Sequence, residues 1–118
     1  MTDAAEEIPC KCCSPDADFR QFKEWRAFDE WDTTNGRFGD ARVDECVECG
    51  RLWLRYFVEY EMISRSGRWA RGLIDPDTAG SITLENVTRY LDGLPHLIRG
   101  GSYFEKAEWS SEPVWWNM

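Results

Sequence analysis

Two Cys-x-x-Cys pairs constrain this chain more than any other feature of its sequence. The first pair is Cys10 and Cys13, and the second is Cys46 and Cys49, which Gly50 follows directly. Two intervening residues let the backbone turn tightly enough to aim both thiolates of a pair at one ion. The glycine can adopt a positive φ and bring backbone N–H groups towards the sulfurs. The four side chains together predict a tetrahedral metal site with four cysteine ligands.

The segment 46–50, CVECG, resembles the knuckle of zinc ribbons and rubredoxins. The resemblance is confined to the two cysteine pairs, so it implies a local metal-binding hairpin and not a whole-chain family. The segment 14–45 between the pairs is longer than the ~15–20 residues usual for a zinc ribbon, and Ser14 replaces the glycine after the first pair. Neither pair has the proline often seen in rubredoxins, so the resemblance implies zinc in preference to iron, with iron still open.

Two other roles stay open for the cysteines, namely a redox disulfide and inert thiols. A thioredoxin-like pair would lie at a strand-to-helix junction, whereas Cys46 and Cys49 lie between two strand-like segments. The chain has five cysteines, an odd number for a disulfide framework. Its acidic N-terminus lacks the apolar region of a secretory signal, so we expect a reducing, cytoplasmic location. Cys12 is the expected spare thiol, and a closed four-cysteine site would be structural.

Two segments are predicted to be helical. Segment 14–33 carries an aromatic residue at every third position, and segment 83–93 carries an apolar stripe that Thr83 can cap and Gly93 can end. The stripe of the second segment consists of Leu84, Val87, Leu91 and Leu94. The aromatic positions of the first segment are Phe19, Phe22, Trp25, Phe28 and Trp31.

The rest of the pattern indicates an antiparallel sheet. Apolar residues at every second position from Leu52 to Met62 predict a long half-buried strand over 51–62. A turn is expected at 64–67, followed by a return strand at 68–74. Shorter strands are expected at 40–46 and 102–109. No segment approaches the ~18 apolar residues that a membrane span requires.

The expected fold class is therefore α+β: a small antiparallel sheet with two packed helices and the four-cysteine knuckle site. We expect a single domain over residues 1–118, with a flexible segment 1–9. Segment 14–45 would be a helix-and-loop insertion between the two cysteine pairs, held at both ends by the metal.

Net charge and the absence of catalytic motifs limit the classes of function that this chain can have. The formal net charge is −8, which repels phosphate backbones and attracts basic partners. The sequence has no nucleophile elbow, nucleotide fingerprint or open metal site, so we expect no catalysis and no catalytic residues. The favoured hypothesis is a zinc-binding protein-interaction module of the immunity or antitoxin type, which neutralises a basic partner.

Two alternatives stay open. One is a zinc-ribbon protein that associates with nucleic acid, and the other is a rubredoxin-like electron carrier that would need iron. The nucleic-acid hypothesis depends on an arginine-rich hairpin formed by Arg51, Arg55, Arg65, Arg68 and Arg71.

The expected partner surface mixes aromatic anchors with carboxylates, which suit interface hot spots and fast encounter with a basic protein. The competing interpretation is that the aromatic residues pack on the sheet as core and the acids only face solvent. The residues assigned to this surface are Trp25, Phe28, Asp29, Glu30, Trp31 and Asp32.

Overall fold

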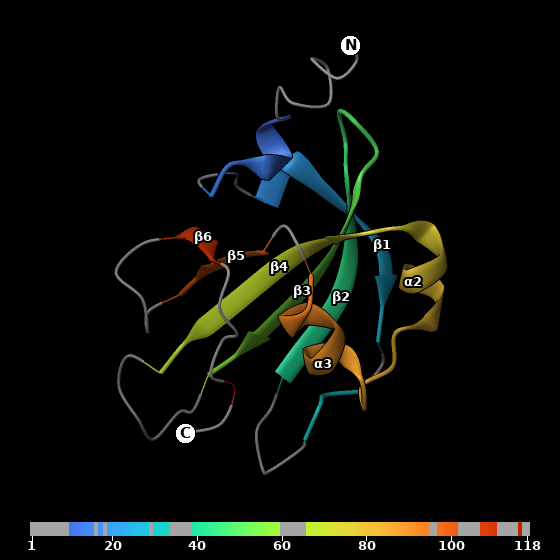
Figure 1. Cartoon of the computed structure of the whole chain (residues 1–118), viewed down its shortest axis with the longest axis vertical. Helices are drawn as coiled ribbons and strands as arrows, with labels where there is room; N and C mark the ends of the chain where they lie inside the picture. Colours follow the sequence, from blue (N-terminus) through green and yellow to red (C-terminus); the bar gives the residue numbers. More distant parts are fainter. Residues whose placement is uncertain are drawn as a thin grey trace.

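A single antiparallel sheet dominates the molecule (Figure 1). The computed structural model describes residues 10–15, 17, 19–28, 30–33, 39–59, 66–94, 97–101, 107–110 and 116. Its six strands follow one another in chain order, so that each pairs with the next. The strands are β1 Phe22–Ala27, β2 Gly39–Cys46, β3 Leu52–Val58, β4 Arg68–Ile74, β5 Leu97–Gly100 and β6 Glu108–Ser110.

The helical content of the described residues is small. Two short helices, α2 Pro76–Ser81 and α3 Val87–Asp92, lie in the connection from β4 to β5. Two 3-10 turns, Lys11–Cys13 and Phe19–Gln21, precede β1. The α+β prediction is therefore wrong, because the fold is mostly β.

The predicted N-terminal helix over 14–33 is the main source of that error. The described part of this segment forms the 3-10 turn Phe19–Gln21 and then β1. Its register against β2 shifts between Glu24 and Arg26, which makes Trp25 the extra residue of a bulge. A turn followed by a bulged strand thus produces an aromatic spacing of three without a helix, and aromatic side chains favour strands.

The central hairpin agrees with the sequence prediction. β3 pairs with β4 from Leu52 opposite Ile74 to Val58 opposite Arg68. β2 covers the strand expected at 40–46. The predicted continuation of β3 over 60–62, and residues 102–106 of the last predicted strand, lie outside the described residues.

The second predicted helix forms, but it begins later than expected. Thr83 and Asn86 exchange hydrogen bonds, from Thr83 N to Asn86 Oδ1 at 2.8 Å and from Asn86 N to Thr83 Oγ1 at 3.2 Å. This reciprocal pair forms a turn of the capping-box kind ahead of α3. α2 has its own cap, because Asp75 Oδ1 accepts from Thr78 N at 2.7 Å.

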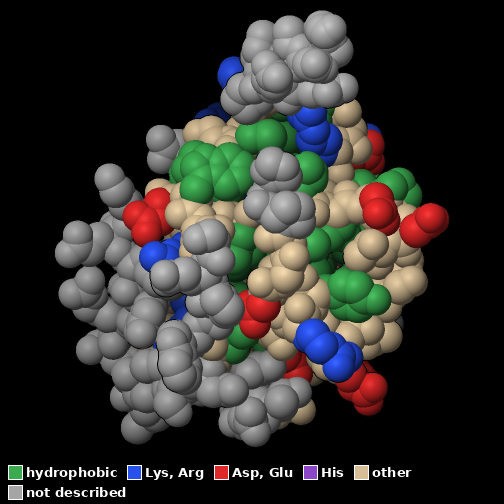
Figure 2. Space-filling view, in the orientation of Figure 1, with side chains coloured by type: hydrophobic (Ala, Val, Ile, Leu, Met, Phe, Trp, Pro, Cys, Tyr) green, Lys and Arg blue, Asp and Glu red, His purple; other side chains and the backbone are tan. Residues whose placement is uncertain are grey.

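The two faces of the sheet bury different side chains. On the helix-covered face, apolar side chains of β2 to β5 pack against α2 and α3. Figure 2, seen from the side where α3 lies, shows apolar side chains at the coloured surface in separate patches. Neither helix of the described residues has the length and apolar character needed to cross a bilayer. The helix-covered face contributes Ala41, Val43, Leu52, Leu54, Tyr56, Val58, Ala70, Ile74 and Leu97, and it meets Ala79, Ile82, Val87, Leu91 and Trp116.

The opposite face has a smaller apolar cluster. Buried Trp53 and Ile98 pack there with Cys12 and Cys46. Three arginines of β2, β3 and β4 lie beside this cluster, so we call this side the arginine face. They are Arg42, Arg55 and Arg71.

Candidate metal centre

Four cysteine sulfurs come together between the N-terminal segment and the β2–β3 turn. Figure 1 shows the backbones of these two segments near each other. The Sγ atoms of Cys10, Cys12, Cys46 and Cys49 all lie within 4.8 Å of one another. The sulfurs of Cys10 and Cys46 are 3.5 Å apart, and those of Cys12 and Cys49 are 3.6 Å apart. Zn–S bonds of about 2.3 Å in a tetrahedron place neighbouring sulfurs about 3.8 Å apart. These four residues, the cysteine cluster, are close enough to hold one metal ion.

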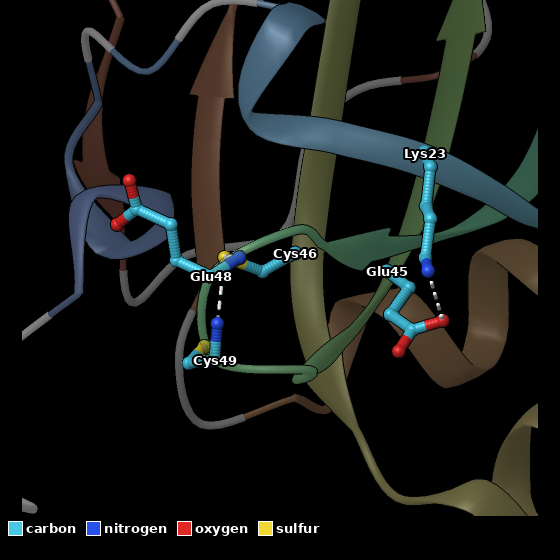
Figure 3. Close-up of polar contacts among 5 residues, drawn as sticks. All are labelled: Lys23, Glu45, Cys46, Glu48 and Cys49. Atoms are coloured by element: carbon cyan, nitrogen blue, oxygen red, sulfur yellow. Dashed lines mark hydrogen bonds and ion pairs between the residues drawn. The ribbon is translucent and has the colours of Figure 1, made fainter.

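The β2–β3 turn folds as a metal knuckle requires. Cys46 N donates to Arg51 O at 2.9 Å, and Gly50 N donates to Cys46 O at 3.0 Å. Gly50 has a φ of 79°, a left-handed conformation that disfavours residues with a Cβ. The backbone N–H groups of Glu48 and Cys49 lie 3.3 and 3.5 Å from Cys46 Sγ, and Figure 3 shows the Cys49 contact.

The strand that leads into this turn is tied to β1. Lys23 Nζ lies 3.9 Å from Glu45 Oε1 across the β1–β2 pair (Figure 3). The Lys23 side chain is largely exposed, so this ion pair contributes little to stability. The position of the turn is set mainly by backbone pairing, since Val47 N also donates to Gln21 O at 3.0 Å.

Side-chain donors add to the N–H groups around the sulfurs. Gln21 Nε2 lies 3.2 Å from Cys46 Sγ, and Arg51 Nη1 lies 3.4 Å from Cys49 Sγ. Donors of this kind offset thiolate charge and orient metal ligands. Residues 21 and 51 directly precede β1 and β3, so the sheet itself positions part of the outer shell of the cluster.

The thiols of the cluster differ in acidity. Burial raises the pKa of Cys46, but hydrogen bonds from the backbone of Cys49, from Gln21 and from Glu48 outweigh it and lower that pKa to about 6. Burial raises the pKa of Cys12 far above its ordinary value. The pKa of Cys10 is also raised: a backbone hydrogen bond from Cys12 lowers it, and burial and the neighbouring thiols outweigh that bond. A bound cation would favour deprotonation of all of them, because the ligands of zinc are thiolates.

The structure changes the membership of the predicted site. Cys10, Cys46 and Cys49 come together as predicted, and Cys12 joins them where the sequence analysis expected Cys13. The 3-10 turn Lys11–Cys13 buries Cys12 completely, while Cys13 is half-buried and packs against the apolar cluster around Trp53. The run CKCC offers two thiols next to each other, and spacing alone cannot choose between neighbours.

The residues expected to form a partner surface do not share one environment. Trp25, Glu30 and Trp31 are exposed, and Phe28 is half-buried under the Arg26 guanidinium at 4.6 Å. Asp32 is buried and accepts a hydrogen bond from the Tyr56 hydroxyl. The side chain of Asp29 lies outside the described residues. Within the described part of the set, only the two tryptophans and Glu30 face solvent.

The arginine-rich hairpin does not form a cationic surface over its described residues. Arg68 and Arg71 are buried, and Arg55 is half-buried. Arg51 donates to the Cys49 sulfur, and Arg65 lies outside the described residues. Little positive charge from the described part of this hairpin therefore reaches solvent as an extended patch.

Comparisons with protein-family models, with curated proteins and with solved structures find no match in any of the three. No family therefore assigns ligands or an activity to this chain. The functional argument depends on the geometry of the cysteine cluster and on the side chains around it.

Proposed function

We propose that this chain is a non-catalytic binding module organised around a structural zinc ion. One observation carries the proposal: four cysteine sulfurs from two distant segments lie within 4.8 Å of one another. Four thiolates complete the tetrahedral coordination that zinc prefers and leave no open position for a substrate or a reactive water. A centre of this kind stabilises the fold and does not perform chemistry.

The position of the cluster gives it a structural task. Cys10 and Cys12 come from the N-terminal segment, and Cys46 and Cys49 from the β2–β3 turn. Among the described residues, the apolar cluster that they adjoin has two large buried side chains, Trp53 and Ile98. Metal bonds would compensate for this small burial, since the binding free energy of structural zinc becomes folding free energy.

The binding role is supported by exposure and charge. Trp25 is 43% exposed and Trp31 is 58% exposed. Exposed tryptophans are favourable hot-spot anchors. Glu24 and Glu30 are exposed nearby in sequence, and the chain carries a net charge of −8. A basic protein, such as the target of an immunity protein or antitoxin, is the partner that this chemistry favours.

Metal analysis tests the centre. We expect one equivalent of zinc per chain and a colourless protein, because a rubredoxin-like iron site would absorb visible light. Cys12→Ser should release the metal, and Cys13→Ser is the matched control that should retain it. If Cys12→Ser keeps the metal and Cys13→Ser loses it, the ligands are the four cysteines expected from the sequence. Metal-free, fully folded wild-type protein would contradict the proposal.

A separate experiment tests the partner. A basic protein encoded by an adjacent gene is the first candidate, and its association can be measured at several salt concentrations. The double variant Glu24→Lys and Glu30→Lys should slow association, most strongly at low salt, without changing zinc content. The control is the double variant Asp77→Lys and Glu85→Lys, which makes the same charge change at two exposed acids in α2 and in the turn before α3. Equal slowing by both variants would show that only net charge matters.

A further inference from the structure

Three arginines form a direct cross-strand row on the arginine face. Arg42 of β2 is the register partner of Arg55 of β3, which is the register partner of Arg71 of β4. Like charges directly opposite each other destabilise a sheet. A negative charge beside the row would offset the repulsion between its guanidinium groups.

Aromatic rings surround the innermost guanidinium. The Cζ atom of Arg71 lies 5.1, 5.6 and 5.2 Å from the ring centroids of Phe22, Trp53 and Trp69. Arg55 lies 6.0 Å from the centroid of Trp69. A cation–π contact stabilises the charge of a guanidinium but offers its N–H groups no oxygen acceptor. The rings therefore hold the guanidinium without satisfying its hydrogen-bond donors.

The N–H groups of Arg71 are only partly used. Its Nη2 atom donates to Ser14 O at 2.7 Å and lies 3.5 Å from Cys12 O. Within the described residues, its buried Nε atom has no hydrogen-bond partner, although only 5% of the residue is exposed. A buried donor without a partner is costly, so a water molecule or a ligand that accepts its hydrogen bond would be stabilised here.

A small cavity adjoins these donors. Its volume is about 90 Å³, and its lining includes the three arginines and Asp44. Asp44 pairs with Arg42 through a contact of 3.1 Å. Within the described residues, no carboxylate forms an ion pair with Arg55 or Arg71. The lining thus has three positive groups and one negative group.

We propose that this cavity binds one small oxyanion, the phosphate or carboxylate group of a ligand, between Arg42, Arg55 and Arg71. Arginine donors match the oxygens of such a group bidentately, and partial burial strengthens each charge-assisted bond. The volume admits a single group and not a polymer. The carboxylates of Glu24 and Asp40 are close enough to interact electrostatically with Asp44 and Arg55, so they disfavour an extended phosphate chain. The cavity is distinct from the cysteine cluster, because no cysteine of the described residues lines it. The two are adjacent, since Arg71 also donates to Ser14 O beside the first cysteine pair.

The test is a titration of the purified, zinc-containing chain with inorganic phosphate and, in a second arm, with acetate. Chloride keeps the ionic strength constant in both arms. Two-dimensional NMR of the arginine Nε–H groups reports on the site directly. We expect a saturable shift of the Arg71 Nε–H signal, and the arm that saturates at lower concentration identifies the preferred oxyanion. A linear, non-saturating drift in both arms would overturn the proposal.

Two variants with the same charge change separate a site from general attraction. Arg55→Gln should weaken binding about tenfold or more, because it removes a charge-assisted donor. Arg89→Gln, on the exposed surface of α3, should bind as the wild type does. Equal weakening by both would overturn the proposal. If Arg55→Gln does not fold, Arg55→Lys is the second variant, because it keeps the positive charge but lacks the two parallel donors of a guanidinium. Unchanged oxyanion binding by Arg55→Lys would also overturn the proposal. Zinc content, measured on every sample, distinguishes failure of this site from failure of the metal centre.

Discussion

The helix-covered face and the arginine face share strands β2, β3 and β4 but are stabilised by different interactions. On the helix-covered face, Leu54, Val58 and Leu91 are fully buried in a large apolar cluster. On the arginine face, the buried apolar side chains of the described residues are few, and the space is filled by cysteines, a stacked guanidinium and the N-terminal segment. Alternation along each strand separates the two sets, since successive side chains point to opposite faces.

This difference shows how a short chain can stabilise a second layer without a second large core. Apolar burial is worth roughly 25 cal/mol per Å², so a face with few apolar residues gains little from covering. Four sulfurs around one ion would supply a strong local link in its place. The link would reach the arginine row directly, because Arg71 donates to Ser14 O next to the first cysteine pair.

Removing the metal link should have the largest effect. Cys46→Ser deletes a buried ligand that accepts three of the hydrogen bonds around the cluster. We expect loss of the metal and a fall in unfolding free energy on the order of 10 kcal/mol, the scale of structural zinc sites. Metal content and thermal unfolding measure both. Cys13→Ser is the control. If Cys46→Ser has the same melting temperature as the wild type, the arginine face does not depend on a metal link for its stability.

A core substitution should affect the other face alone. Leu54→Ala removes a fully buried side chain from the helix-covered face, and the loss of packing should cost about 2–5 kcal/mol. We expect a lower midpoint in denaturant and an unchanged zinc stoichiometry under native conditions. Release of zinc from the folded Leu54→Ala protein would show that the two faces are coupled more tightly than their separate clusters indicate.

The knuckle turn offers a smaller and cleaner test. Gly50 has a φ of 79°, and a Cβ added there would meet only Glu45 Oε2, at 3.8 Å. Gly50→Ala should therefore cost only the backbone penalty of a left-handed residue, about 1–2 kcal/mol. We expect weaker zinc affinity in competition with a chromogenic chelator. The control is Gly80→Ala in α2, where an added Cβ meets nothing within 4 Å. Equal zinc affinity in the two alanine variants would show that the turn does not depend on the left-handed glycine.

The sequence predicted the parts of this molecule that depend on local pattern. The strands Leu52–Val58 and Arg68–Ile74 are confirmed, because apolar residues at alternate positions are a local signal of a strand. Burial is not limited to one face, since Trp53 and Arg71 on the arginine face are buried too. The Cys-x-x-Cys-Gly pattern predicted the β2–β3 turn for the same reason, since spacing and φ are local constraints.

The parts that failed depend on contacts between distant segments. Aromatic spacing around Trp25 favoured a helix, but pairing of β1 with β2 and a bulge at that residue decide the structure. The spacing of apolar residues in one segment cannot predict a bulge, because a bulge is a shift of register relative to a partner strand. Membership of Cys12 in the cysteine cluster depends likewise on which side of a 3-10 turn faces the sheet. The arginine row is visible only once the register of β2, β3 and β4 is known.

The smallest expected effect concerns the charge balance of the arginine row. Asp44 is 4% exposed and pairs with Arg42, so it competes with any anion for that guanidinium. Burial raises the pKa of its carboxyl group and the Arg42 charge lowers it, with burial the stronger influence. Asp44→Asn removes the competing charge while keeping a side chain of similar size. We expect phosphate to bind a few-fold more tightly, because the variant neither repels the anion nor pairs with Arg42. Asp77→Asn, on the exposed surface of α2, is the control. Weaker phosphate binding by Asp44→Asn, with zinc content and fold preserved, would mean that the carboxylate orients Arg42 for the ligand instead of competing with it.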